Sequence, residues 1–219
     1  MPSKRSRKET IHIGKESIEL VIPKGTLWGA ETQLALDNFT GSNGESITGY
    51  KVPKEFIYAL VTIKRAAAKV NGELGAIPHE VAKAIIRACD EVLKGKWDDQ
   101  FPLDVVNAGA CTSVHMNVNE VLANRATEIL QRGNKKAKVD QHNHVNYGQS
   151  TNDVIPTTIR ISAVLAARPL VVGVEALEEG GFEVSDRSVL APMEVPTFFR
   201  LEEFGSYCEC RFVPPETAK

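Results

Sequence analysis

The architecture of this chain depends on the segment His144-Val-Asn-Tyr-Gly-Gln-Ser-Thr-Asn-Asp-Val-Ile-Pro156. Short polar side chains crowd this segment, apolar periodicity is absent from it, and it ends at a proline. Proline suits the first turn of a helix, where the N–H that it lacks would be unpaired anyway. We therefore expect a helix to begin at Pro156, with the polar residues at its N-terminus.

The residues just before Pro156 have two interpretations. A helix N-terminus carries partial positive charge and free N–H groups, so the donors of Ser150, Thr151 and Asn152 could form a cradle for a carboxylate or phosphate. The alternative is an ordinary N-cap, in which one of these side chains serves only the helix backbone. This stretch alone leaves both open, and caps are the commoner arrangement.

Helical periodicity dominates the chain on both sides of this segment. Apolar residues recur at three- and four-residue steps in residues 53–72 and again in 78–95, which predicts two antiparallel helices joined by a short link. A third helix is expected from a cap at Asn117 or Asn119 to Leu130, and a long one after Pro156. The positions that define the first helix are Phe56, Ile57, Leu60, Val61, Lys64, Ala67 and Ala68.

The N-terminal part has a different pattern. Apolar and polar residues alternate in residues 11–22 across Gly14, which predicts two short strands or an extended arm. A short helix is expected in residues 28–39. The basic cluster formed by Lys4, Arg5, Arg7 and Lys8 has no apolar run behind it, so we expect a solvated terminus.

The composition limits the classes of function. The chain has 219 residues, is 42% hydrophobic and 25% charged, and carries a net charge of −2, so nothing favours nucleic acid or an anionic membrane as partner. No segment approaches the ~20 apolar residues of a transmembrane helix. The cysteines match neither a disulfide framework nor a paired zinc spacing, which favours a cytoplasmic location. They are Cys89, Cys111, Cys208 and Cys210.

A metal site is the weaker interpretation of the histidines. Asp140, His142 and His144 could face one side of an extended segment. No further ligand cluster accompanies them, so we expect polar loop histidines, no metal and no other cofactor. His144 could instead be a neutral or cationic partner for a bound carboxylate. Cys111 is expected to be a small buried residue.

Four segments in order carry a resemblance to a known family. They are Leu27-Trp-Gly-Ala-Glu-Thr-Gln33, Asp99-Gln-Phe-Pro-Leu-Asp104, Gly109-Ala-Cys-Thr-Ser-Val-His-Met-Asn-Val-Asn-Glu-Val-Leu-Ala-Asn-Arg125 and His144-Val-Asn-Tyr-Gly-Gln-Ser-Thr-Asn-Asp153. Together they strongly resemble the aspartase/fumarase superfamily, with the Thr-Ser and Gln-Ser-Thr-Asn wording closer to aspartate ammonia-lyase than to class II fumarate hydratase.

The resemblance implies a mainly α-helical fold and a homotetramer in which three subunits share each active site. An N-terminal lyase domain would span residues 1–139, the start of a central long-helix bundle residues 140–182, and a divergent tail residues 183–219.

The resemblance also implies a substrate-binding group. Thr112, Ser150, Thr151 and Asn152 would hold the substrate carboxylate and amino group, with Ser113, Asn117 and His144 close by. Cys111 replaces a glycine of the family, and Asp140-Gln-His-Asn143 replaces His-Pro-Asn-Asp. The family's catalytic base is a serine in a loop beyond the end of this chain, so the catalytic residue is unknown.

The expected reaction is elimination of ammonia from L-aspartate to give fumarate, which makes the protein a carbon–nitrogen lyase. A base would remove the proton next to the β-carboxylate, and clustered hydroxyl and amide donors would stabilise the resulting charge. One alternative is fumarate hydratase, with water in place of ammonia. The other is a catalytically inactive, truncated remnant or an assembly partner.

Overall fold

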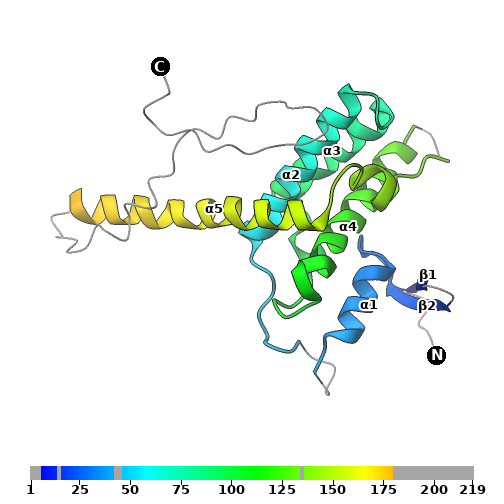
Figure 1. Cartoon of the computed structure of the whole chain (residues 1–219), viewed down its shortest axis with the longest axis horizontal. Helices are drawn as coiled ribbons and strands as arrows, with labels where there is room; N and C mark the ends of the chain where they lie inside the picture. Colours follow the sequence, from blue (N-terminus) through cyan, green and yellow to red (C-terminus); the bar gives the residue numbers. More distant parts are fainter. Residues whose placement is uncertain (1–5, 14–15, 42–45, 134–135, 180–219) are drawn as a thin grey trace. The chain divides into compact units, whose positions relative to one another are not determined.

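The computed structural model describes residues 6–13, 16–41, 46–133 and 136–179. These residues form one β-hairpin and five α-helices, joined by short 3₁₀ and π turns (Figure 1), which confirms the predicted mainly α fold. The chain divides into two units, Met1–Ala163 and Val164–Lys219. The expected domain limits stay predictions, and the expected divergent tail lies outside the described residues.

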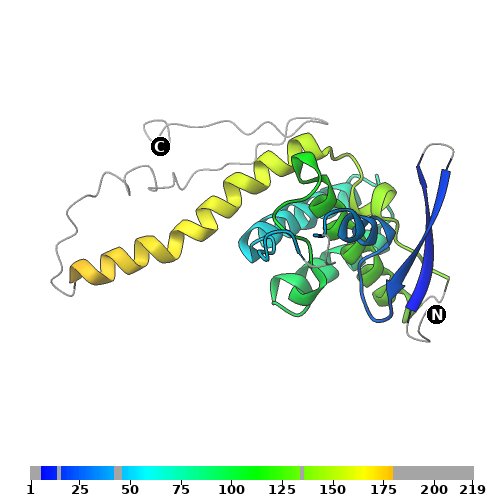
Figure 2. The ribbon, with the colours of Figure 1, turned by 90° about the horizontal axis from the view of Figure 1, so that it is seen from below.

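The predicted strands form an antiparallel hairpin beside α1 (Figures 1 and 2). Strand β1 spans Ser6–Ile13 and β2 spans Glu16–Pro23. Leu20 and Ile22 project from the same face of β2, because they are two residues apart, and both are buried against Ala30 of α1. Burial of this apolar face anchors the hairpin.

The basic cluster is not simply a solvated terminus. Arg7 lies within β1, where it pairs with Glu9 at 2.7 Å and donates to the carbonyl of Thr26 at 2.9 Å and to that of Trp28. The prediction for Arg7 was wrong because strand pairing brings the residues after β2 within its reach. Lys8 forms an exposed pair with Glu19, while Lys4 and Arg5 lie outside the described residues.

Helices α1 (Ala30–Asn38), α2 (Lys54–Glu73) and α3 (His79–Leu93) confirm three predictions. The apolar faces of α2 and α3 pack together and supply much of the core, including Leu60, Val61, Ile85 and Val92. Gly72 permits their close approach at the link, since an added Cβ would lie 2.5 Å from that of Ala82.

Helix α4 spans Thr112–Gln131 and begins five residues before Asn117. The prediction that Asn117 or Asn119 caps it was wrong, because both are buried inside the helix at 1% and 0% exposure. Asn117 donates to the carbonyl of Gln100 at 3.2 Å. A helix covered on nearly all sides, as α4 is from Val114 to Ala123, has no single apolar stripe that would mark its start.

Glu120 of α4 joins α4 to α1. Its side chain is buried, and its oxygens accept hydrogen bonds at the start of α1 from the N–H groups of Gly29 (2.8 Å), Glu31 (2.8 Å) and Thr32 (3.1 Å) and from the Thr32 hydroxyl (2.6 Å). A carboxylate there satisfies free N–H groups and the helix dipole. Burial raises the pKa of Glu120, although these hydrogen bonds oppose the increase.

Two more hydrogen bonds join the first of the four segments that carry the family resemblance to the second and the third. The side-chain oxygen of Gln100 accepts a hydrogen bond from the N–H of Leu27 at 2.6 Å. The side chain of Asn124 donates to the carbonyl oxygen of Leu27 at 2.7 Å. These three segments therefore contact one another and fix the residues just before α1.

Helix α5 spans Thr151–Glu179 and begins before Pro156, so the predicted start was wrong. Ser150 caps it: its hydroxyl accepts from the N–H of Asn152 at 3.2 Å and its carbonyl from that of Val154 at 3.0 Å. A serine cap sets the start, and Pro156 is accommodated one turn later. The helix continues through Pro169.

The segment Gln141–Val145 is a π-helical turn and not an extended strand. Asp140 stabilises it by accepting from the N–H groups of His142 at 2.9 Å and Asn143 at 2.7 Å. Asn146 ends this turn, five residues before the start of α5.

None of the helices in the described part of the chain combines the length and apolarity that a bilayer-spanning helix requires.

Candidate functional site

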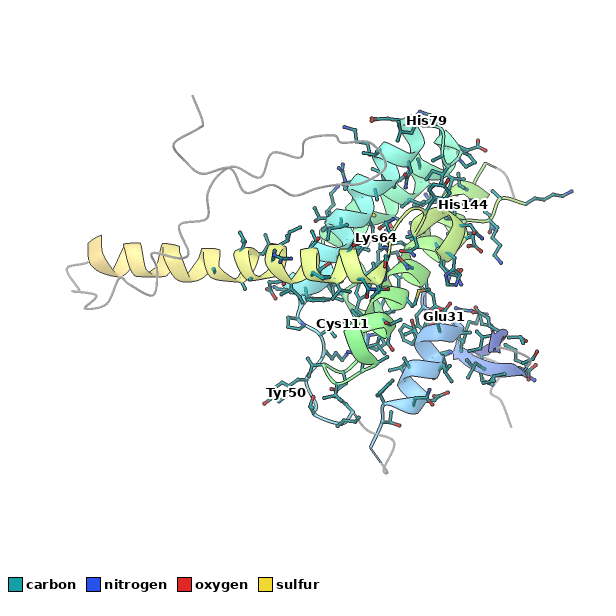
Figure 3. The ribbon with its side chains drawn as sticks, viewed as in Figure 1. Glu31, Tyr50, Lys64, His79, Cys111 and His144 are labelled. Atoms are coloured by element: carbon teal, nitrogen blue, oxygen red, sulfur yellow. The ribbon has the colours of Figure 1, made fainter. Side chains whose placement is uncertain are left out.

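A buried polar network connects α2, α4, the segment after the π turn and the start of α5. Figure 3 labels Lys64, its member from α2. Lys64 of α2 is 0% exposed. Its Nζ donates to Oδ1 of Asn146 at 2.7 Å and lies 2.6 Å from Nε2 of His115. Nδ1 of His115 lies 2.8 Å from the hydroxyl oxygen of Thr151. The network therefore leads from the core to the first residue of α5.

Burial controls the charge of this network. It lowers the pKa of Lys64 to about 7. Burial, and secondly the charge of Lys64, lower the pKa of His115 to about 4. At neutral pH the imidazole is therefore neutral. No carboxylate in the part of the chain that the structure describes forms an ion pair with Lys64.

Lys64 was not expected at the site, although its position carried a signal. It follows Leu60 and Val61 on the apolar face of α2, at four- and three-residue spacing. Lysine is rarely buried completely, so a lysine in the middle of a core-facing stripe marks a special environment. His115 lies within the third segment of the family resemblance and is a buried residue of α4.

The Ser150–Asn152 group divides between the two interpretations left open by the sequence. Ser150 is exposed and its hydroxyl caps α5, so it serves the backbone. Thr151 is half-buried and contacts His115, so its hydroxyl belongs to the polar network. Asn152 is exposed beside it.

Thr112 begins α4, is exposed, and donates to the carbonyl of Gly109 at 3.1 Å. Thr112 lies three residues before His115, and this spacing puts both on one side of α4. The imidazole of His115 contacts Thr151. Ser113 follows and is half-buried. The contact between His115 and Thr151 therefore joins α4 to the first residue of α5.

His144 lies apart from this group, well separated from the start of α4 at Cys111 in Figure 3. Its Nδ1 accepts from the N–H of Asp140 at 3.0 Å, which leaves Nε2 as its donor. Asn117, being buried, lies in the core and not with the exposed hydroxyls.

Before α4, Ala110 and Cys111 both have left-handed backbones, with φ values of 57° and 55°. Such φ values are strained for residues with a Cβ. Cys111 is half-buried and not fully buried as expected, and burial raises the pKa of its thiol. This environment does not activate it as a nucleophile.

The candidate metal ligands do not share one face. Asp140 is used by the backbone of the π turn, and His142 Nε2 lies 2.9 Å from the carboxylate of Glu31. Within the described ranges, no group of three His, Cys, Asp or Glu side chains could hold a metal ion.

Comparison with known proteins identifies the class to which this fold and site belong. The family profile described as "Lyase" matches residues 20–183, so the chain belongs to this lyase family of the fumarase/aspartase superfamily. Class II fumarate hydratase from Nitrosomonas europaea is 49% identical over 161 residues, which are 72% of this chain and 33% of the relative. The enzyme of that name from Thermus thermophilus is 47% identical over 148 residues, which are 68% of this chain and 31% of the relative.

Solved structures agree with this assignment. A class II fumarase from Schistosoma mansoni has a TM-score of 0.63 and 34% identity, covering 74% of this chain and 33% of that one. A "fumarate lyase:delta crystallin" from Brucella melitensis bound to cobalt has a TM-score of 0.67 and 33% identity, covering 78% and 36%. The chain thus spans about a third of the length of the relatives that it matches. These relatives favour the fumarate hydratase alternative over the expected ammonia-lyase.

Proposed function

We propose that this chain supplies part of the substrate site of a fumarate hydratase, a carbon–oxygen lyase that interconverts fumarate plus water with malate. The observation that carries this proposal is the 49% identity to a class II fumarate hydratase over 161 residues. The segments quoted for the family resemblance lie within the matched lyase region.

The geometry supports a carboxylate ligand. Thr112 and Thr151 each occupy the first position of a helix, and the contact between His115 and Thr151 joins these helix starts. Helix N-termini attract negative charge, and hydroxyls beside them add donors. We assign direct carboxylate contacts to Thr112, Thr151 and Asn152, and an indirect role to Ser150 through its cap. Ser113 and His144 remain proposed substrate-site residues.

Such a site assists the chemistry by stabilising charge. Removal of a proton from the carbon next to one carboxylate of malate develops a second negative charge on that carboxylate, after which hydroxide leaves from the neighbouring carbon and is protonated to water. Preorganised donors lower the energy of this charged intermediate. No described residue is assigned as the base.

Aspartate ammonia-lyase is the second candidate. The Thr112-Ser113 pair and the Gln149-Ser-Thr-Asn152 wording resemble that enzyme. The two reactions share fumarate and differ in the leaving group, so one assay separates them.

The test follows fumarate absorbance with L-malate and, separately, L-aspartate, and measures the binding of fumarate to the same protein by calorimetry. We expect fumarate binding, and turnover with malate only. Turnover with aspartate alone would select the ammonia-lyase. Absence of both fumarate binding and turnover would contradict the proposed function.

We also propose a homo-oligomer, as the family resemblance implies. Light scattering at high protein concentration should give a mass of several chains. A monomeric mass across the concentration range would contradict this.

A further inference from the structure

Among the described residues, the completely buried Lys64 has only uncharged hydrogen-bond partners. Lys64 Nζ contacts Asn146 and His115, from two different elements. Cys89 of α3 is the remaining titratable group in its surroundings, and burial raises the pKa of that thiol, so it stays uncharged. The nearest ion pair on α2, between Arg65 and Asp90, is half-exposed and self-contained.

The direction of each hydrogen bond in this network follows from Lys64. Below its pKa of about 7, Lys64 is an ammonium group that can only donate, so Nε2 of His115 must accept. The neutral imidazole then carries its proton on Nδ1, which donates to the hydroxyl oxygen of Thr151. The hydroxyl proton of Thr151 is consequently directed away from His115.

Thr151 differs in this respect from the next threonines of α5. The hydroxyls of Thr157 and Thr158 donate to the carbonyls four residues earlier, at 2.9 and 2.8 Å, which is usual inside a helix. Thr151 is the first residue of α5 and has no helical carbonyl behind it. Its hydroxyl is held by His115 instead.

We propose that Lys64 and His115 are positioning residues: they hold the Thr151 hydroxyl with its oxygen toward His115 and its proton toward a bound carboxylate. This inference deepens the proposed function and relies on it for the identity of the ligand. Lys64 never touches the substrate. It acts through His115 and, in its protonated form, adds a buried positive charge behind Thr151, which favours an anion in a site of low dielectric.

The first test is spectroscopic and needs no activity. Nitrogen-15 NMR of histidine-labelled full chain at pH 6 should show His115 as the Nδ1–H tautomer, with Nε2 unprotonated. Lys64→Met should release this constraint and give a mixture of tautomers. An Nε2–H tautomer or an imidazolium in the wild-type protein would overturn the proposal, whether or not fumarate binds.

The second test measures fumarate binding by calorimetry. Thr151→Val and Lys64→Met should each weaken binding about tenfold, and the double variant should be no weaker than about twentyfold, because both remove the same hydrogen bond. Thr157→Val is the matched control and should leave binding unchanged. Fully additive losses near a hundredfold would show that Lys64 does not act through Thr151.

The two tests distinguish a failure of the proposed function from a failure of the positioning role of Lys64 and His115. If wild-type protein binds no fumarate, the proposed function fails, while the tautomer still decides whether Lys64 and His115 position Thr151. If Lys64→Met does not fold, the wild-type tautomer and the binding of Thr151→Val provide the decision.

Discussion

Glu120 and Lys64 are both buried charged residues that contact α4 or belong to it, yet their surroundings differ. The Glu120 carboxylate accepts from four donors at the start of α1, so the chain itself satisfies the charge. Lys64 has two neutral partners, and its network leads outward to Thr151 at a half-buried position. A buried charge that is satisfied within the fold serves structure, whereas one that is not is suited to a ligand.

The strongest test of this comparison removes the carboxylate. We expect Glu120→Ala to lower the free energy of unfolding by about 3 kcal/mol, because it leaves several buried N–H groups without an acceptor. Urea denaturation measures the change. Glu128→Ala, at a half-exposed position of the same helix, is the control and should cost less than about 1 kcal/mol. A loss below 1 kcal/mol at Glu120 would remove its structural role.

The pH dependence of the free energy of unfolding should reveal the lowered pKa of Lys64. The pKa of Lys64 is about 7 in the folded protein, below the ordinary lysine value of 10.5, so the unfolded chain binds more protons between these pH values. Stability should therefore rise with pH between about 7 and 10, by at most about 1.4 kcal/mol per pH unit. Lys64→Met should flatten this rise. Parallel stability curves for both proteins would mean that Lys64 titrates normally.

Replacing Lys64 should separate stability from binding. At pH 7 we expect Lys64→Met to change the free energy of unfolding by no more than about 1 kcal/mol, since the loss of two hydrogen bonds is offset by removal of a buried charge. Fumarate affinity should nevertheless fall about tenfold. Parallel denaturation and calorimetry check both. A large loss of stability with unchanged affinity would place Lys64 in the same class as Glu120.

The smallest expected effect concerns the loop before α4. Cys111→Gly should raise stability by about 1 kcal/mol, because glycine adopts a φ of 55° without strain. Thermal unfolding at constant pH measures it. Ser113→Gly is the control and should be destabilising, because its position is helical. No gain at Cys111 would mean that side-chain packing offsets the strain.

The sequence predicted elements well where an apolar stripe and clear ends coincide. Helices α2 and α3 follow Pro53 and Pro78 and confirm the periodicity of their faces. The predictions from the sequence were wrong at the starts of α4 and α5. Asn117 resembles a cap in sequence, but it donates to a carbonyl of another segment, and Pro156 resembles a first residue, but Ser150 caps the helix before it.

The sequence by itself determined the mainly helical class, the lyase family resemblance and the polar segment before α5, and it left two short strands or an extended arm open for the N-terminal part. These follow from periodicity, turn residues and motif order, which are local or cumulative along the chain. Only the tertiary structure decided that Glu120 caps α1 and that Lys64 reaches Thr151 through His115. Glu120 and Thr32 are 88 positions apart, and His115 and Thr151 are 36 positions apart. The packing of the helices, not the spacing along the sequence, selects which buried side chains meet.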